Sequence, residues 1–383
     1  ADNNTAIGLD ALQANTTGNK NVAVGALAAD ATTTGSNNAI VGYNAFTANT
    51  TGSSNTVLGS EALRDNTTAH NNTAIGYATL YENTTGTANV AVGGNAMQNN
   101  TTGDNNTAVG STALDANTTA SNNTAVGKSA LGSNTTGVQN TSVGSLSLQT
   151  STTSSSNAAF GYSALKVNTG SQNSAFGANA LSNNTSGTQN TGIGFQAARQ
   201  STTANNITAV GWRTLDANTT GSDNTAIGKS ALFANTTGAQ NVAVGSGALD
   251  ANTTASNNTA VGYSSLGANT SGTRNAAFGD AALVANTTGN DNAGLGGFSL
   301  SANTTGSQNT SCGAYALNKN TTANNNTAVG YLALFENTTG TSNVAVGANA
   351  LDANTTGIEN VAVGKNALSA NTTGCCSTAI GDQ

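Results

Sequence analysis

The sequence predicts an all-β protein, a parallel β-solenoid (β-roll) of about 22–23 coils. A marker glycine that ends the motif Asn-Thr-Ala-Val-Gly recurs every 17 residues and appears 23 times. One interval is 16 residues, because Asn168-Thr169-Gly170 lacks a threonine. A helical repeat needs about 30 residues or more for its two helices, so this unit is too short to be helical. A fixed period indicates stacked modules, which predicts one continuous repeat domain over residues 1–383.

The apolar residues are in phase with the marker glycine, which we number position 0 and which runs from Gly8 to Gly381. Position −1 is apolar in every copy, position −2 is Ala in 17 of 23 copies, and position +4 is Leu in 18 of 22. The β-prone Thr-Ala-Val segment and the segment x-Ala-Leu-x-Ala are predicted as two short strands per coil. Glycine at position 0 and the run Asn-Thr-Thr-Gly supply the turns, because Gly and Asn tolerate positive φ.

Stacking explains the polar positions that do not vary. In a solenoid, each position lies above the same position of the previous coil. Position −4 is Asn in 21 of 23 copies, which predicts a ladder of side-chain amides. Position +8 is Thr in all 22 copies, which predicts either a hydroxyl ladder or bonds to turn amides. We interpret these residues as structural rather than as ligands.

The strand must point its alternate side chains to opposite faces. We expect Val at −1 and Leu at +4 to fill the interior, which places Ala at −2 outside. A stripe of small residues lets another surface approach closely, so it predicts contact with a second copy of the chain. The alternative interpretation is that Ala only suits a tight neighbouring turn.

Composition argues against several classes of function. The net charge of −7 and pI near 4.4 argue against nucleic-acid or anionic-membrane partners, which need a basic patch. No apolar run approaches the roughly 18 residues of a membrane span, so no membrane insertion is expected within this chain. His70 is the only histidine, which excludes a His-based triad or multi-His metal site within one chain. The carboxylates occupy variable turn positions, and we expect no catalysis, metal or cofactor.

The three cysteines carry separate expectations. Cys312 occupies position −1 and is expected to be a small core hydrophobe. Cys375 and Cys376 fall in the last turn, where they are either free or mutually paired thiols or form a disulfide to a neighbouring chain. Both ends of the chain are in phase with the repeat and carry no cap, which predicts either that the segment was cut from a longer chain or that its ends stack on other molecules to make a filament.

Aromatic residues gather at position +1, which otherwise carries Ser, Lys, Ala, Gly or Asp and is expected to face solvent or a partner. Aromatic side chains there are candidates for stacking on sugars or for burial in a subunit contact. These candidate surface-contact residues are Tyr43, Tyr77, Tyr162, Phe195, Trp212, Tyr263 and Tyr331.

At Asn4-Thr5-Ala6-Ile7-Gly8 and Asn21-Val22-Ala23-Val24-Gly25 the chain resembles the head repeats of YadA-like trimeric autotransporter adhesins. The resemblance implies left-handed parallel β-rolls that form homotrimers and bind host or matrix surfaces. The family's common unit is shorter, because the Asn-Thr-Thr-Gly turn is additional here. Similar arrays also resemble the shafts of phage tail fibres.

These features predict a structural or adhesive fibre segment at an extracellular or cell-surface location, or in a virion fibre. Its expected partners are copies of itself, as a homotrimer or filament, and a host, matrix or sugar surface. One alternative is a phage tail-fibre shaft. Another is an ice-binding solenoid, although Thr at +8 and +9 lies in a turn and not in a Thr-x-Thr strand.

Overall fold

The computed structural model describes residues 2–382, which form 23 strands of three residues and no helix. Each coil contributes one strand, at positions −3 to −1. The chain divides into two compact units, Ala1–Gln189 and Asn190–Gln383. Within each unit neighbouring strands pair in parallel, which confirms the predicted β-solenoid with its 17-residue repeat.

The strands of the first unit are β1 (Thr5–Ile7), β2 (Val22–Val24), β3 (Ala39–Val41), β4 (Thr56–Leu58), β5 (Thr73–Ile75), β6 (Val90–Val92), β7 (Thr107–Val109), β8 (Thr124–Val126), β9 (Thr141–Val143), β10 (Ala158–Phe160) and β11 (Ser174–Phe176). Those of the second unit are β12 (Thr191–Ile193), β13 (Thr208–Val210), β14 (Thr225–Ile227), β15 (Val242–Val244), β16 (Thr259–Val261), β17 (Ala276–Phe278), β18 (Ala293–Leu295), β19 (Thr310–Cys312), β20 (Thr327–Val329), β21 (Val344–Val346), β22 (Val361–Val363) and β23 (Thr378–Ile380).

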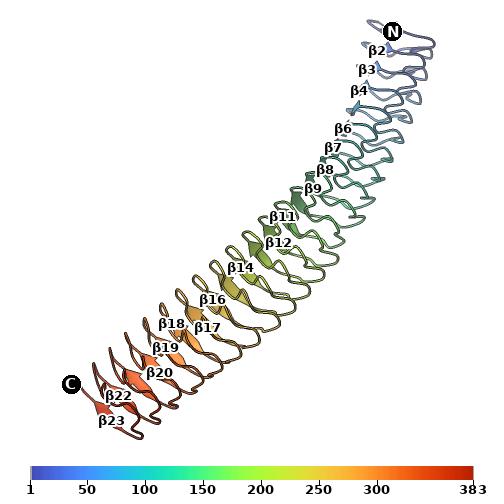
Figure 1. The fold of residues 1–383 in the computed structure, drawn as a ribbon. Coiled ribbons are helices and arrows are strands. Elements are labelled where there is room, and N and C mark those ends of the chain that lie inside the picture. The colour runs from blue at the N-terminus through green and yellow to red at the C-terminus, as the bar shows by residue number, and fades with distance from the viewer. Residues whose placement is uncertain (1, 383) are drawn as a thin grey trace. The chain divides into compact units, whose positions relative to one another are not determined.

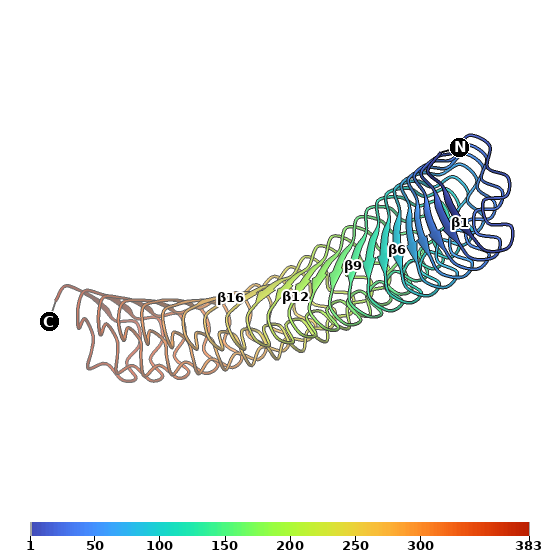
Figure 2. The same ribbon diagram turned by 90° about the horizontal axis from the view of Figure 1, so that it is seen from above.

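Strand register places equivalent positions of successive coils side by side. Strand β7 pairs with β8 so that Ala108 lies beside Ala125 and Val109 beside Val126. Figure 1 and Figure 2 show the strands of each unit following one another in chain order, with β6 and β9 of the first unit on the same side of the coils. The 16-residue coil keeps this register, since Phe160 pairs with Phe176. The missing residue is therefore absorbed in the turn.

The predicted sidedness of the strand is wrong. Ala108 at −2 is fully buried, whereas Val109 at −1 is 37% exposed. The reason is space, which the −2 glycine Gly294 reveals. A Cβ added there would lie 3.3 Å from Cδ1 of Leu283 and 3.2 Å from Oγ of Ser299. Leucine at +4 fills the interior, so a small residue suits position −2 in most coils, although Ile40 and Val57 are also buried there.

The second apolar segment is not a strand. Ala113 and its neighbour Leu114 are both fully buried, whereas consecutive residues of a strand point to opposite faces. Left-handed backbone at Thr112 (φ 54°) and Leu114 (φ 52°) brings both side chains inside. This conformation costs about 1–2 kcal/mol per residue. Burial of a leucine side chain contributes about 1.5–3 kcal/mol in return.

Two buried asparagine ladders run along each unit, and Nδ2 of Asn106 donates to Oδ1 of Asn89 at 3.2 Å, which confirms the predicted amide stacking at −4. Oδ1 of Asn106 accepts the backbone N–H of Asn123 at 3.0 Å, and Nδ2 of Asn106 donates to the carbonyl of Ala120 at 2.9 Å. At position +7, Nδ2 of Asn117 donates to Oδ1 of Asn100 at 2.7 Å and also to the Ala120 carbonyl at 3.0 Å. Both ladders therefore meet at the +10 carbonyl.

The threonine at +8 bonds to backbone rather than to the next hydroxyl. Oγ1 of Thr101 donates to the carbonyl of Thr118 in the next coil at 3.0 Å, and the same carbonyl accepts the Thr101 N–H at 2.8 Å. This arrangement differs from a ladder of hydroxyls. Each threonine side chain joins two coils through their main chains.

Glycine occurs at positions 0 and +10 for different reasons. Marker Gly110 has φ 134°, and a Cβ on it would lie 2.6 Å from the Gly127 carbonyl oxygen. Gly86 at +10 does not have positive φ, contrary to the turn-based expectation. A Cβ on it would instead lie 2.5 Å from the Gly103 carbonyl oxygen of the next coil. Close stacking of coils and the Oδ1 atom of Asn83, also 2.5 Å from the added Cβ, together favour glycine at +10.

Candidate functional site

The strands present an uncharged surface with an apolar row, which we define as positions −3 and −1 of each coil and call the outer strand face. Position −1 is Val, Ile, Leu, Phe or Cys in all 23 copies, and position −3 is Thr in 13 and Val, Ala or Ser in the rest. Ile227 and Leu295 at −1 are each 41% exposed. Isolated apolar side chains at a surface are ordinary, but a contiguous row marks an interaction site.

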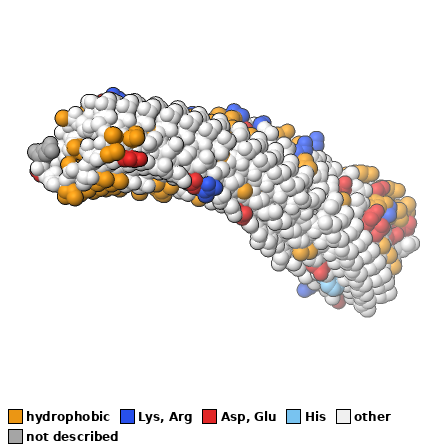
Figure 3. Space-filling model, turned by 90° about the horizontal axis from the view of Figure 1, so that it is seen from below, with side chains coloured by type: hydrophobic (Ala, Val, Ile, Leu, Met, Phe, Trp, Pro, Cys, Tyr) orange, Lys and Arg blue, Asp and Glu red, His pale blue; other side chains and the backbone are white. Residues whose placement is uncertain are grey.

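Neighbouring side chains of this row touch. The rings of Phe160 and Phe176 stack in parallel, with centroids 4.8 Å apart, which is the spacing of adjacent strands. Side chains at −1 therefore form a continuous ladder outside the coil. The face drawn in Figure 3 carries few charged side chains, with hydrophobic groups among mostly uncharged atoms.

The predicted contact stripe at −2 is wrong. Ala108, Ala125 and Ala226, which the sequence placed outside, are all fully buried. Any contact through the strands must use positions −3 and −1. Absence of charge does not identify the correct face, because position −2 is uncharged in every copy as well.

The aromatic residues at +1 are exposed in all seven predicted cases, which are Tyr43, Tyr77, Tyr162, Phe195, Trp212, Tyr263 and Tyr331. They come from separate coils and do not converge on one site. Sequence reasoning missed a neighbouring row at +2, where Phe298 stacks on Tyr315 with ring centroids 5.3 Å apart. Tyr315 also meets the edge of Tyr331 at 6.4 Å. The signal for this row is the pair of aromatic residues at +2 of successive coils, Phe298 and Tyr315.

The cysteines are all exposed thiols. The expectation that Cys312 is a core residue is wrong, because position −1 faces outward. Cys375 and Cys376 lie together in the last turn, where Sγ of Cys376 donates to Oε2 of Glu359 at 3.7 Å. Contact with the Cys375 thiol raises the pKa of the Cys376 thiol, so no activated thiolate is favoured there. A disulfide to a neighbouring chain stays a prediction.

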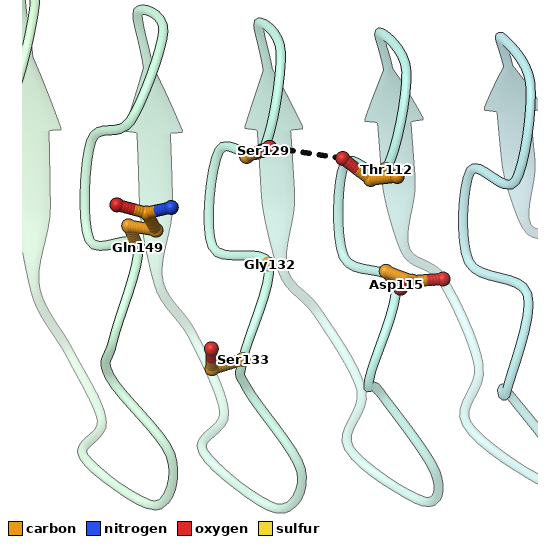
Figure 4. A pocket seen from close by; sticks show the side chains of 6 residues that line it. All are labelled: Thr112, Asp115, Ser129, Gly132, Ser133 and Gln149. Atoms are coloured by element: carbon orange, nitrogen blue, oxygen red, sulfur yellow. Dashed lines mark hydrogen bonds between the residues drawn. The ribbon is translucent and has the colours of Figure 1, made fainter.

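A depression of the surface lies at position +5 of three successive coils (Figure 4). It separates Asp115 from Gln149, and its floor is Gly132, which has no side chain to continue the row. Thr112 and Ser129 close one side through a 2.9 Å hydrogen bond between their hydroxyls. Burial raises the pKa of Asp115. The depression is therefore a gap in a row of side chains.

Within residues 2–382, no three His, Cys, Asp or Glu side chains lie together as a metal site requires. The same part of the chain has no helix of sufficient length and apolarity to cross a membrane. A comparison with protein-family models and with curated protein sequences finds no match.

Proposed function

We propose that this chain is a non-catalytic structural fibre segment whose copies associate laterally through the outer strand face. The observation that carries the proposal is the exposed ladder at position −1. Val109, Ile227 and Leu295 each leave more than a third of their surface in water. Removing apolar surface from water stabilises by about 25 cal/mol per Å².

The best occupant of this face is a second copy of the same chain. A copy repeats its own face with the same period, so two faces match coil by coil. The eleven strands β1–β11 at about 4.8 Å spacing extend about 50 Å, and the face is about 10 Å wide with its side chains. Two such faces bury about 1,000 Å² in total, which is the size at which an interface becomes specific.

Positions −3 and −1 carry no charge in any copy, so association of like faces meets no charge repulsion. The resemblance to trimeric adhesins supports a homotrimer and an extracellular, cell-surface or virion location. Adhesion to a host, matrix or sugar surface fits the exposed aromatic residues at +1. The homotrimer, the location and the adhesive contact are parts of the same proposal.

The test compares two triple lysine variants in the same three coils. The first changes three valines of the outer strand face, of which Val109 is exposed and the other two are half-buried: Val109→Lys, Val126→Lys and Val143→Lys. The control changes exposed threonines at position +9: Thr119→Lys, Thr136→Lys and Thr153→Lys. Sedimentation velocity at micromolar concentration is expected to give a multiple of the chain mass for the parent and the control, and the chain mass for the valine variant.

Circular dichroism and thermal melting establish that each variant stays folded. A parent that sediments at the 37.3 kDa mass of one chain overturns lateral association. A threonine variant that dissociates equally overturns the assignment to this face, since both variants add the same charge.

Ice binding remains a second candidate because of one observation. Position +9 carries an exposed Thr or Ser in every coil except the shortened one, among the coils from Gly8 to Gly364. These hydroxyls and methyls recur at about 4.8 Å, the spacing of the coils. A thermal-hysteresis assay uses the same variants in opposite roles. If the row at +9 binds ice, thermal hysteresis is lost in the threonine variant and kept in the valine variant.

A further inference from the structure

A cluster of cationic and aromatic side chains covers three successive coils of the second unit. The chain has ten Lys and Arg, and three of them fall between residues 199 and 229. We call the group the basic cluster; its members are Arg199, Trp212, Arg213, Asp216, Lys229 and Phe233. They occupy positions +1, +2 and +5, outside the outer strand face.

One buried carboxylate holds two arginines in place. The Asp216 side chain is 2% exposed, and its Oδ1 lies 2.9 Å from Nε of Arg199. Its Oδ2 accepts hydrogen bonds from Nε and Nη2 of Arg213 at 3.0 and 2.8 Å. A single carboxylate neutralises one of the two guanidiniums, so one positive charge remains. Arg213 has five N–H donors and uses two on Asp216, which leaves three for a ligand.

Trp212 lies close to this charge and to a second one. The ring is 45% exposed, and it lies 5.3 Å from the guanidinium carbon of Arg213 and 5.6 Å from Nζ of Lys229. The Arg213 guanidinium is also 4.7 Å from the Phe233 ring. Lys229 is exposed and has no ion pair among residues 2–382. The next carboxylate at +5, Asp250, lies one coil beyond Phe233.

We propose that the basic cluster binds an acidic saccharide, in which a uronic-acid carboxylate lies on Lys229 and Arg213. Charge-assisted hydrogen bonds from these groups to a carboxylate are stronger than neutral ones. The exposed indole face suits the apolar face of a sugar ring. The net charge of the cluster is +2, in a chain of net charge −7 that repels anions elsewhere. A nucleic acid would require many more phosphate contacts than these cations offer.

The chain supplies a site-specific probe, because Trp212 is its only tryptophan. Titration with a trimer of galacturonic acid is expected to give a saturable change in tryptophan emission. The neutral trisaccharide maltotriose is expected to bind at least tenfold more weakly, and added NaCl is expected to weaken binding of the acidic trimer. Inorganic phosphate serves as the control for a simple anion.

Lys229→Gln is expected to weaken binding of the acidic trimer roughly tenfold, the effect of losing one charged hydrogen bond. The matched control is Lys365→Gln, since Lys365 also occupies position +1 but follows Ala348 instead of an aromatic residue. Absence of a saturable emission change, equal loss in both variants, or phosphate binding as tight as the trimer overturns the proposal. Sedimentation of the variants separates this outcome from failure of lateral association, because neither lysine lies on the outer strand face.

Discussion

Oδ1 of Asn106 accepts the backbone N–H of Asn123, one coil further along the chain, at 3.0 Å. A side chain here replaces the backbone carbonyl as the partner of a buried amide, and its own Nδ2 satisfies the Ala120 carbonyl at 2.9 Å. One asparagine thus satisfies two main-chain groups that water cannot reach. A leucine of similar volume would satisfy neither group.

Asn106→Leu is expected to reduce the free energy of unfolding by about 1–3 kcal/mol, because the Asn123 N–H is left unpaired while the Ala120 carbonyl keeps its hydrogen bond from Asn117. Thermal or denaturant unfolding followed by circular dichroism measures the effect. Thr119→Ala in the same coil changes an exposed side chain and is expected to stay within about 0.5 kcal/mol of the parent. Equal stability of the two variants would contradict the role of the −4 ladder.

Ile207 interrupts the −4 ladder of the second unit. It is 1% exposed and donates its backbone N–H to Oδ1 of Asn190 at 3.1 Å, but it has no oxygen to offer the backbone of Asn224. Ile207→Asn completes the ladder and is expected to raise stability by about 1 kcal/mol. Ile207→Val, which only shortens the side chain, is expected to lower stability by about 0.5–1.5 kcal/mol. Melting temperatures in the reverse order refute this prediction.

The marker glycine cannot accept a side chain. Gly110→Ala places a Cβ 2.6 Å from the Gly127 carbonyl oxygen at φ 134°, and is expected to destabilise by several kcal/mol. Gly94 is one position after a marker glycine and has no atom within 4 Å of an added Cβ. Gly94→Ala is therefore the control, with an expected change of less than about 0.5 kcal/mol. Similar urea midpoints for both variants would exclude stacking contact as the cause.

Acid is expected to stabilise this fold. Desolvation raises the pKa of four aspartates: Asp30, Asp115, Asp250 and Asp352. Each of these carboxyl groups therefore binds its proton more tightly in the folded state than in the unfolded state. The stability from this term is fully present below the unfolded pKa of about 3.9 and is lost as pH rises through the raised folded pKa. The melting temperature should therefore rise from pH 7 to pH 4. The rise should be smaller in the double variant that carries Asp115→Asn and Asp250→Asn. A fall on acidification contradicts the prediction.

The period, the parallel stack, the interior leucine at +4 and the asparagine ladder at −4 were all predictable, because each depends on residues that recur in phase. Which of Ala108 and Val109 faces the interior was not predictable, since hydrophobicity ranks valine as the better core residue. What decides it is the space left beside Leu114 and its equivalents, and a sequence does not state the width of a coil. The left-handed backbone at Thr112 and Leu114 was also missed, because neither residue type favours it.

The basic cluster illustrates the same limit at a site. Trp212 was a candidate from its position, but Asp216 had no distinguishing pattern. Its significance comes from Arg199, which lies 17 residues earlier and yet is one coil away. Side chains that meet across coils become visible only when the sequence is folded at its period.

The shortened coil has a consequence for how such a chain evolves and for how it can be engineered. Phe160 and Phe176 remain in register although Asn168-Thr169-Gly170 omits the residue at +9. Oδ1 of Asn168 still accepts a hydrogen bond from Asn184 at 2.7 Å. The corner at +9 is thus a place where the chain changes length without disturbing its neighbours. Insertions, like deletions, should be tolerated there, so this corner is the natural attachment point for a grafted peptide or label.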